Sequence, residues 1–233
     1  MKEIQSAKNP RIKELKKLHK KAEYLLEGFH LIEEAASSDA EIKELFVTQR
    51  GMKEWGDWLA VNKEISTFLV SDEVMTAMSD LPTPQGILAV MTLTSEDTPD
   101  FSGGWLLLDN VQDPGNVGTM IRTADAFGMA GVLLGKGTAD IYSTKVLRSM
   151  QGSNYHLPVL QKELGDVSPV MKGKGFTVYG TELNEEAHAL DKVEKTEDFA
   201  IIMGNEGQGV SQEILSLTDQ NVYIPMKGNA ESL

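Results

Sequence analysis

The second half of the chain contains a series of short apolar runs, and this series constrains the fold more than any other feature. The runs are WLLL (105–108), GVLL (131–134), LPVL (157–160), FTVYG (176–180), AIIMG (200–204) and VYIP (222–225). Patterns with helical period lie between several of them, at 117–127, 142–150, 162–172 and 210–217. Short apolar strands that alternate with helices predict a parallel sheet with helices on both faces.

A smaller α/β unit precedes this sheet. Its expected strands are 44–48, 66–70 and 86–91, and its expected helices are 28–37, 52–61 and 72–79. A first helix begins at Asn9-Pro10, a cap residue followed by proline at the first helical position. Its apolar stripe consists of Ile12, Leu15, Leu18, Ala22 and Leu25. The polar run at 92–104 is typical of a linker. We therefore expect domains at 1–92 and 104–233, joined by residues 93–103.

Composition excludes several classes of protein. The 233 residues include no cysteine, so disulfides, thiolate nucleophiles and cysteine-bound metals are excluded. The four histidines are scattered without ligand spacing, and no metal site is expected. No apolar run approaches the ~20 residues of a membrane span, and the N-terminus lacks a signal sequence. We expect a cytoplasmic protein that does not bind membranes.

Charge is distributed unevenly along the chain. The net charge is −13, but residues 1–21 contain eight cationic and two acidic side chains. A cationic segment on an acidic body can contact phosphate locally. The candidate RNA-binding residues are Lys8, Arg11, Lys13, Lys16, Lys17, Lys20 and Lys21. The alternative, a solvated helix face, is equally compatible with this pattern.

The loop after the strand at 105–108 crowds polar side chains at the sheet edge where ligands bind in parallel α/β folds. Its sequence is DNVQDPGNVG, and Asn116 is expected to cap a helix that begins at Val117. Arg122 follows six residues later, and its planar guanidinium suits a phosphate. An ordinary strand–turn–helix corner, with Arg122 in solvent, is the alternative.

The loop after AIIMG is glycine-rich but does not match a phosphate loop. Its sequence, NEGQGVS (205–211), contains neither G-x-G-x-x-G nor Gly-Lys-Ser/Thr. Glu206 lies at its centre, where a polyanion would be repelled. S-adenosylmethionine, which carries a sulfonium and an amine but no phosphate, suits such a loop. The alternative is a plain loop before a serine-capped helix.

Three motifs, in order, resemble those of the SpoU-type (TrmH-type) RNA ribose 2′-O-methyltransferases of the SPOUT superfamily. They are NVQDPGNVGTMIRTADAFG (110–128), IIMGNEGQGVS (201–211) and VYIPMKGNAESL (222–233). SAKNPRIKELKKLHKK, EGFHLIEEA and TPQGILAV resemble the family's N-terminal substrate-binding domain. The resemblance implies an α/β catalytic domain with a deep trefoil knot, an exception to unknotted topology. It also implies S-adenosylmethionine as cofactor, a homodimer, and a ribose 2′-hydroxyl of ribosomal or transfer RNA as acceptor.

The resemblance also assigns residues to roles. The catalytic positions are Asn116, Arg122, Glu206 and Ser232. The cofactor-binding positions are Thr181, Glu182, Met203, Gly204, Asn205, Glu206, Gly207, Ile224, Met226, Ser232 and Leu233. A guanidinium stays protonated, so we expect Arg122 to hold phosphate and stabilise the developing alkoxide rather than act as a base.

The third motif departs from the family, in which it continues through Asn-Val into a closing helix. The sequence stops at Leu233, so we expect that helix to be missing and S-adenosylmethionine binding to be weak for the sequence as given. Two alternative functions remain open at this point. One is an RNA base methyltransferase of the same fold, and the other is an RNA-binding protein without catalysis.

Overall fold

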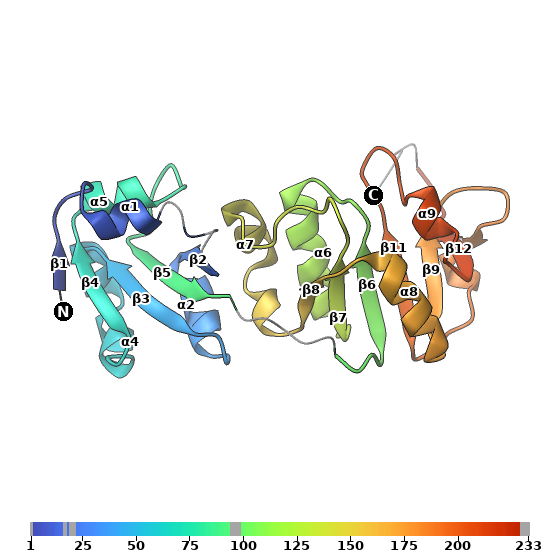
Figure 1. Cartoon of the computed structure of the whole chain (residues 1–233), viewed down its shortest axis with the longest axis horizontal. Coiled ribbons are helices and arrows are strands. Elements are labelled where there is room, and N and C mark those ends of the chain that lie inside the picture. Colours follow the sequence, from blue (N-terminus) through green and yellow to red (C-terminus); the bar gives the residue numbers. More distant parts are fainter. Residues whose placement is uncertain (1, 16–17, 19–21, 94–98, 229–233) are drawn as a thin grey trace. The chain divides into compact units, whose positions relative to one another are not determined.

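The computed structural model describes residues 2–15, 18, 22–93 and 99–228. Contacts between Cα atoms divide the chain into two compact units. The first comprises residues 1–95 together with 142–156, and the second comprises 96–141 together with 157–233. Figure 1 labels the elements of both units.

The first unit is built on a mixed sheet of five strands in the order β1-β4-β3-β5-β2. The strands are β1 (Lys2–Ile4), β2 (Glu23–Glu27), β3 (Ile42–Val47), β4 (Ser66–Val70) and β5 (Ile87–Thr92). β1, β4 and β3 run parallel, whereas β5 pairs antiparallel with both β3 and β2. The helices are α1 (Pro10–Leu15), α2 (Phe29–Ala36), α3 (Gln49–Glu54), α4 (Gly56–Val61) and α5 (Asp72–Met78).

The core of the first unit lies between this sheet and helices α1 and α5. Ile12 and Val74 are fully buried there against Phe46 of β3. The rings of Phe46 and Phe68 stack with centroids 5.1 Å apart, which joins β3 to β4. Burial of large apolar side chains such as these is the main stabilising term for a small mixed sheet.

The prediction that the first helix extends to Leu25 was wrong. α1 ends at Leu15, and residues 23–27 form strand β2. The helical stripe was misleading because Tyr24 and Leu26, two residues apart, are the side chains that β2 buries against its neighbours. The backbone pairs of β2 with β5 satisfy the polar groups on the side of β2 that faces β5, which a helix would have satisfied internally.

A segment of the second half of the chain belongs to the first unit by its contacts. It contains α7 (Thr144–Met150) and the 3₁₀ turn at Ser153–Tyr155. The hydroxyls of Tyr24 and Tyr155 lie 2.9 Å apart, and the rings of Tyr24 and Tyr142 have centroids 4.6 Å apart. Burial raises the pKa of Tyr24, and the neighbouring Tyr155 raises it further. These aromatic contacts fix the segment on β2.

The second unit has a sheet of seven strands in the order β10-β12-β9-β11-β6-β7-β8, and every pair is parallel. The strands are β6 (Gly104–Leu108), β7 (Gly131–Leu134), β8 (Val159–Gln161), β9 (Thr177–Thr181), β10 (His188–Ala189), β11 (Phe199–Met203) and β12 (Gln220–Tyr223). The helices are α6 (Pro114–Ala126), α8 (Leu164–Gly173) and α9 (Gln212–Leu215), with a 3₁₀ turn at Leu190–Lys192. The predicted α/β class with a parallel sheet is confirmed.

The core of the second unit explains why its strands were visible in the sequence. Leu107 and Ile202 are fully buried on adjacent central strands, and Met171 of α8 packs on them. Figure 1 shows α8 and α9 in front of the strands. Strands that helices cover on both faces have apolar residues at nearly every position. These strands are therefore the apolar runs that are visible in the sequence.

Two negative findings apply to the described residues only. Within those ranges, no helix is long and apolar enough to cross a lipid bilayer. The same ranges hold no cluster of three or more His, Asp or Glu side chains arranged to bind a metal ion.

Candidate functional site

Four neighbouring strands of the second unit end at one edge of its sheet. β12, β9, β11 and β6 are adjacent and parallel, so the loops that follow them meet at their carboxyl ends. These loops carry the three motifs and the segment after Thr181. This edge is where ligands bind in open parallel sheets.

Glu206 joins the loop after β11 to the loop after β6. Its Oε1 accepts hydrogen bonds from the backbone amide of Asp113 at 3.0 Å and from Nδ2 of Asn116 at 3.2 Å. Its Oε2 accepts one from the amide of Gln112 at 3.2 Å. Two predicted site residues, Asn116 and Glu206, are therefore in direct contact, although 90 positions separate them in the sequence.

The pKa of Glu206 reflects these contacts. Desolvation raises the pKa, but hydrogen bonds from the backbone amides of Glu206 itself, Asp113 and Gln112, and from Asn116, outweigh it. The pKa of this carboxyl therefore lies below its ordinary value. The group is exposed and ionised at neutral pH, so it acts as an acceptor and not as an acid.

A second carboxylate, Asp109, ties the same two loops together from inside. It is buried, and its Oδ2 accepts a hydrogen bond from the amide of Ser211 at 2.7 Å. Its own amide donates to the carbonyl of Met203 at 2.8 Å, which extends the pairing of β6 with β11. Sequence reasoning noted Asp109 only as one of several polar residues. The signal in the sequence that could have identified Asp109 was its position directly after a buried strand.

The helix cap in the first motif differs from the expectation. α6 begins at Pro114, and the side chain of Asp113 accepts a hydrogen bond from the amide of Asn116 at 2.9 Å. Asp113 is therefore the N-cap, and the prediction that Asn116 caps a helix starting at Val117 was wrong. Because Asn116 does not cap the helix, its side-chain amide can bind Glu206.

The loop after β11 is a tight turn closed by its own backbone. Asn205 and Gly209 exchange two backbone hydrogen bonds of 2.9 Å, and Oδ1 of Asn205 accepts from the amides of Gly207 and Gln208. A Cβ at Gly204 would lie 2.0 Å from the Val210 nitrogen, so no side chain fits there. The glycine therefore allows the two strands of the turn to approach closely.

Thr181 and Glu182, at the end of β9, have structural partners on neighbouring strands. The hydroxyl of Thr181 donates to the carbonyl of Ile202 at 2.8 Å. Oε2 of Glu182 accepts from Nδ2 of Asn221 at 3.0 Å and from Asn184 at 2.6 Å. Asn221, which sequence reasoning did not select, thus anchors this carboxylate beside the loop that follows β12.

Arg122 is exposed on α6 and makes no ion pair or hydrogen bond with the described part of the chain. The structure does not bring it into contact with Asn116 or Glu206. Six residues along a helix correspond to about 9 Å of axial rise, so the guanidinium lies well beyond the first turn of α6. Its positive charge has no acidic partner among the described residues, so it can bind an anion from solution.

The third motif is only partly described. Ile224 and Met226 follow β12, and these large apolar residues are 53% and 39% exposed. Met203 is half-buried at the end of β11. Ser232 and Leu233 lie outside the described residues.

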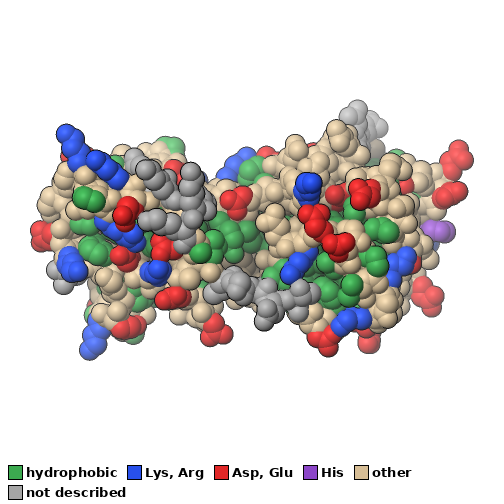
Figure 2. Space-filling model, viewed as in Figure 1, with side chains coloured by type: hydrophobic (Ala, Val, Ile, Leu, Met, Phe, Trp, Pro, Cys, Tyr) green, Lys and Arg blue, Asp and Glu red, His purple; other side chains and the backbone are tan. Residues whose placement is uncertain are grey.

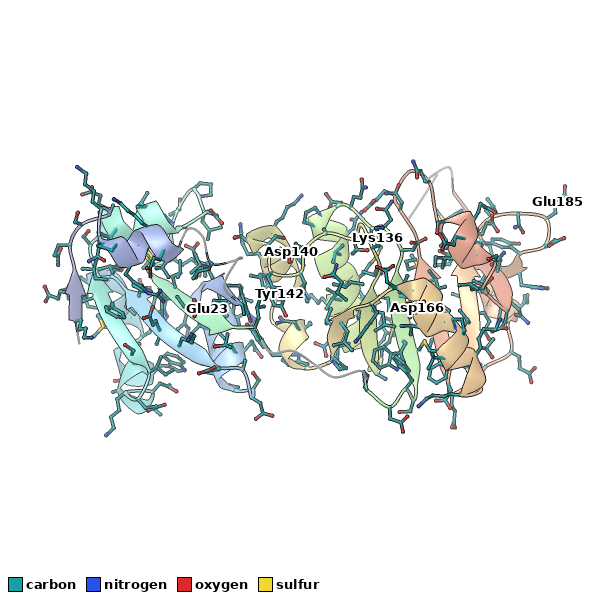
Figure 3. The ribbon with its side chains drawn as sticks, in the orientation of Figure 1. Glu23, Lys136, Asp140, Tyr142, Asp166 and Glu185 are labelled. Carbon is teal, nitrogen blue, oxygen red and sulfur yellow. The ribbon has the colours of Figure 1, made fainter. Side chains whose placement is uncertain are left out.

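The loop after β7 supports the first motif from its other side. The amide of Gly135 and the hydroxyl of Thr138 both donate to the carbonyl of Leu108, and Ala139 donates to Val111. Figure 3 shows Lys136 and Asp140 on this loop. The end of β6 and Val111 of the first motif are thereby held by hydrogen bonds from this loop.

The predicted RNA-binding residues of the first unit are only partly described. Lys8 and Lys13 are exposed, whereas Arg11 binds Oε2 of Glu44 through Nε and Nη2 at 2.9 and 2.6 Å. Arg11 therefore has a structural role in the first unit. Lys16, Lys17, Lys20 and Lys21 lie outside the described residues. Figure 2 shows lysine and arginine interspersed with acidic side chains over one face of the molecule.

Comparisons with known proteins show which proteins this chain resembles. Residues 105–233 match the SpoU rRNA Methylase family, and residues 9–89 match the MRM3-like substrate binding domain. The chain is 42% identical to the 23S rRNA (guanosine(2553)-2′-O)-methyltransferase RlmP of Bacillus subtilis, over 100% of this chain and 94% of that protein. It is 33% identical to an uncharacterized tRNA/rRNA methyltransferase of Synechocystis, over 99% of this chain and 88% of that protein.

A solved structure gives the same result. The AdoMet-bound rRNA methyltransferase from Sinorhizobium meliloti superposes with a TM-score of 0.86 at 26% identity, covering 100% of this chain and 92% of that one. The match of a family model to more than half of the chain, together with full-length relatives, places it without ambiguity. The chain belongs to the SpoU rRNA methylase family.

Proposed function

We propose that this protein transfers a methyl group from S-adenosylmethionine to a ribose 2′-hydroxyl of 23S rRNA. The observation that carries the proposal is the 42% identity with RlmP over the whole length of the chain. The identity extends through the first unit, so it covers the substrate-binding part as well as the motifs. Ribosomal RNA methylation is also what the family model describes.

The residues at the sheet edge fit the cofactor. The exposed carboxylate of Glu206 disfavours a polyanion there but tolerates a ligand with a sulfonium and an amine. The exposed side chains of Ile224 and Met226 offer apolar surface to an adenine ring. The tight turn at 204–210 supplies backbone groups near the same edge. When bound, S-adenosylmethionine supplies the methyl group as an electrophilic sulfonium.

Each first-motif residue has a role in this proposal. Glu206 holds the two loops together and orients the amide of Asn116 toward the acceptor nucleotide. Arg122 binds the phosphate beside the target ribose and stabilises the alkoxide that develops when the hydroxyl loses its proton, which passes to phosphate or solvent. Positioning and electrostatics of this kind can supply most of the rate enhancement of a methyl transfer.

The proposal includes four further features that rest on the family resemblance. Residues 1–92 bind RNA and residues 104–233 carry out the transfer. The second unit contains a deep trefoil knot. Two copies form a homodimer, and the exposure of Phe127, the residue directly after α6, supports this, since 82% of the residue is accessible to solvent. An rRNA substrate would be consistent with a protein of the cytoplasm, which we include in the proposal.

Labelled methyl transfer tests the function. The protein, radiolabelled S-adenosylmethionine and an unmodified 23S rRNA transcript are incubated, and the RNA is digested to nucleosides. A labelled 2′-O-methylguanosine supports the proposal. A labelled base would assign the protein to the base-methylating branch, and absence of label, with RNA bound, would leave an RNA-binding protein without catalysis.

A further inference from the structure

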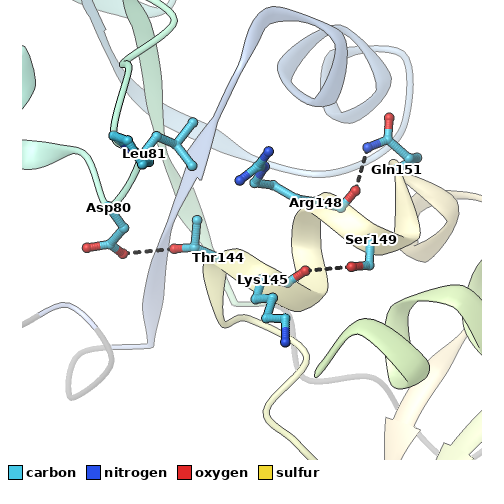
Figure 4. A pocket seen from close by; sticks show the side chains of 8 residues that line it. Asp80, Leu81, Thr144, Lys145, Arg148, Ser149 and Gln151 are labelled. Carbon is cyan, nitrogen blue, oxygen red and sulfur yellow. Dashed lines mark hydrogen bonds between the residues drawn. The ribbon is translucent and has the colours of Figure 1, made fainter. Parts of the chain in front are cut away.

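Asn110, the second residue after β6, has a left-handed backbone with a φ of +56°. Most side chains make this conformation costly, and asparagine is among the few residues that tolerate it. Gln151 shares the conformation, but it directly follows α7, where left-handed residues are common, and its side chain donates to the carbonyl of Arg148 (Figure 4). Asn110 ends no helix, and α6 begins only at Pro114. A costly conformation that no helix end requires is a reason to look for a function.

The backbone carbonyl of Asn110 holds the turn of the second motif. It accepts a hydrogen bond of 3.0 Å from Nδ2 of Asn205. Oδ1 of the same Asn205 accepts the amides of Gly207 and Gln208 at 2.9 and 3.1 Å. One side chain therefore connects two backbone amides of the turn to a peptide group of the first motif. That peptide group directly follows the α-carbon of Asn110, so the left-handed backbone sets its direction.

The side chain of Asn110 packs against a third loop, the one that follows β7. A Cβ at Gly137 would lie 2.3 Å from Oδ1 of Asn110, so the glycine leaves the room that this side chain occupies. The same oxygen accepts a hydrogen bond from Nε2 of Gln112 at 3.3 Å. The carbonyl of the next residue, Val111, accepts the amide of Ala139 at 2.9 Å. Asn110 therefore lies where the loops after three adjacent strands, β11, β6 and β7, meet.

This contact complements the one made by Glu206. The carboxylate of Glu206 accepts amides of the first motif, whereas Asn110 offers a first-motif carbonyl to a donor of the second. The two links have opposite polarity and act on adjacent residues, Asn205 and Glu206. Ordering a loop costs conformational entropy, and a turn that is held before its ligand arrives does not draw that cost from binding.

We propose that Asn110 is a positioning residue for S-adenosylmethionine. Its left-handed backbone directs the carbonyl that holds Asn205, and this contact keeps the turn at 204–210 in the conformation that receives the cofactor. The inference rests on the proposed function, since it takes that turn to bind S-adenosylmethionine. Asn110 acts through Asn205 and needs no contact with cofactor or RNA. Its replacement should therefore change cofactor affinity and leave the rate at saturating cofactor near that of the parent.

The test compares two replacements of Asn110 in the full chain by titration with S-adenosylmethionine. Asn110→Val, whose branched side chain disfavours a left-handed backbone, should weaken binding about tenfold. Asn110→Gly removes more of the side chain but adopts the left-handed backbone freely, so its affinity should stay within about threefold of the parent. Equal losses in the two variants, or no loss in Asn110→Val, would overturn the inference.

Gly175→Val is the matched control for backbone strain. Gly175 has a φ of +92° and lies in open space just before β9, at the amino edge of the same sheet. The variant places the same side chain on a left-handed backbone, but it should leave S-adenosylmethionine affinity unchanged. In transfer assays, Asn110→Val should raise the KM for the cofactor about tenfold and keep kcat within about twofold. A loss of affinity in Gly175→Val equal to that in Asn110→Val, or a fall in kcat alone, would contradict a positioning role.

A double-mutant cycle tests whether Asn110 acts through Asn205. Asn205→Ala removes the side chain that receives the effect, so it should weaken cofactor binding by itself. The double variant Asn110→Val/Asn205→Ala should then bind S-adenosylmethionine about as well as Asn205→Ala does, because the contact is already lost. Losses that add in the double variant would show that Asn110 acts by another route and would overturn the inference.

Hydrogen exchange of the Gly207 and Gln208 amides gives a readout that needs no cofactor. Both amides should exchange several-fold faster in Asn110→Val than in the parent or in Gly175→Val, and unchanged exchange would overturn the inference. A parent that does not bind S-adenosylmethionine would contradict the proposed function, while the exchange rates would still decide whether Asn110 holds the turn. If Asn110→Val does not fold, Asn110→Ala is measured in its place by the same criteria.

Discussion

Oε1 of Glu206 accepts a hydrogen bond from Nδ2 of Asn116 at 3.2 Å, so the second motif contacts the first through two side chains. The same carboxylate accepts two backbone amides of the loop that precedes α6. An acceptor-only group is required for this pattern, because all three partners donate. The charge of Glu206, and not only its shape, therefore orders the two loops.

Glu206→Gln should lower S-adenosylmethionine affinity by about tenfold, since a glutamine amide nitrogen would face backbone donors. Glu186→Gln, an exposed change elsewhere in the second unit, is the control. Isothermal titration of both variants checks the prediction. Equal affinity in Glu206→Gln and the parent would mean that these hydrogen bonds do not order the cofactor site.

The effect of Glu206 should depend on pH. Its pKa is lower in the folded protein than its ordinary value of 4.5, so the ionised form stabilises the fold. That contribution is present above the ordinary pKa and is lost as the pH falls through the folded pKa. The difference in unfolding free energy between the parent and Glu206→Gln should therefore shrink on acidification below about pH 4.5. Urea unfolding across this range measures it, and a constant difference would contradict the assignment.

Two glycines of the second motif should differ in how much their replacement by alanine destabilises the protein. A Cβ at Gly204 would lie 2.0 Å from the Val210 nitrogen, whereas at Gly207 the nearest atom is 3.7 Å away. Gly204→Ala should destabilise the protein by about 2 kcal/mol or more, because backbone must move. Gly207→Ala should change stability by less than about 1 kcal/mol. Similar midpoints of chemical unfolding for both variants would show that the turn at 204–210 is looser than the structure indicates.

Asp109→Ala should destabilise the second unit by about 2 kcal/mol, because it leaves the amide of Ser211 without its charged acceptor. Glu185→Ala removes an exposed carboxylate at the outer edge of the same unit, where Figure 3 shows it projecting away, and should have little effect. Unfolding in urea compares the two. A loss in Asp109→Ala no larger than in the control would mean that the contact between these loops is not structural.

The strands of the second unit could be predicted because helices cover them. Leu107 and Ile202 are buried, and the runs around them are apolar at every position. β2 could not be predicted from its pattern, because Leu25 continued the helical stripe of Ile12 and Leu15 by coincidence. Only the pairing with β5, which is a tertiary interaction, identifies residues 23–27 as a strand.

The sequence predicted site residues at the ends of the strands, but it could not predict the contacts between them. The position of Glu206 in a glycine-rich loop indicated a role, but its partners on the first motif are long-range and have no local signature. The cap of α6 is a different case. Asp113 precedes Pro114, and proline at the first helical position is the signal that could have identified Asp113, and not Asn116, as the N-cap.

Arg122→Lys should keep the fold and S-adenosylmethionine affinity but lower methyl transfer by about 100-fold or more. Arg122 has no partner among the described residues, so its replacement breaks no contact of the folded chain. A lysine presents a single charged group in place of a bidentate hydrogen-bond donor, which weakens binding of the phosphate and stabilisation of the developing alkoxide.

Arg50→Lys, which changes an exposed arginine of the first unit, is the matched control and should retain nearly full activity. Single-turnover transfer to the 23S rRNA transcript, measured with saturating cofactor, separates chemistry from binding. Near-parental rates in Arg122→Lys would remove Arg122 from the mechanism.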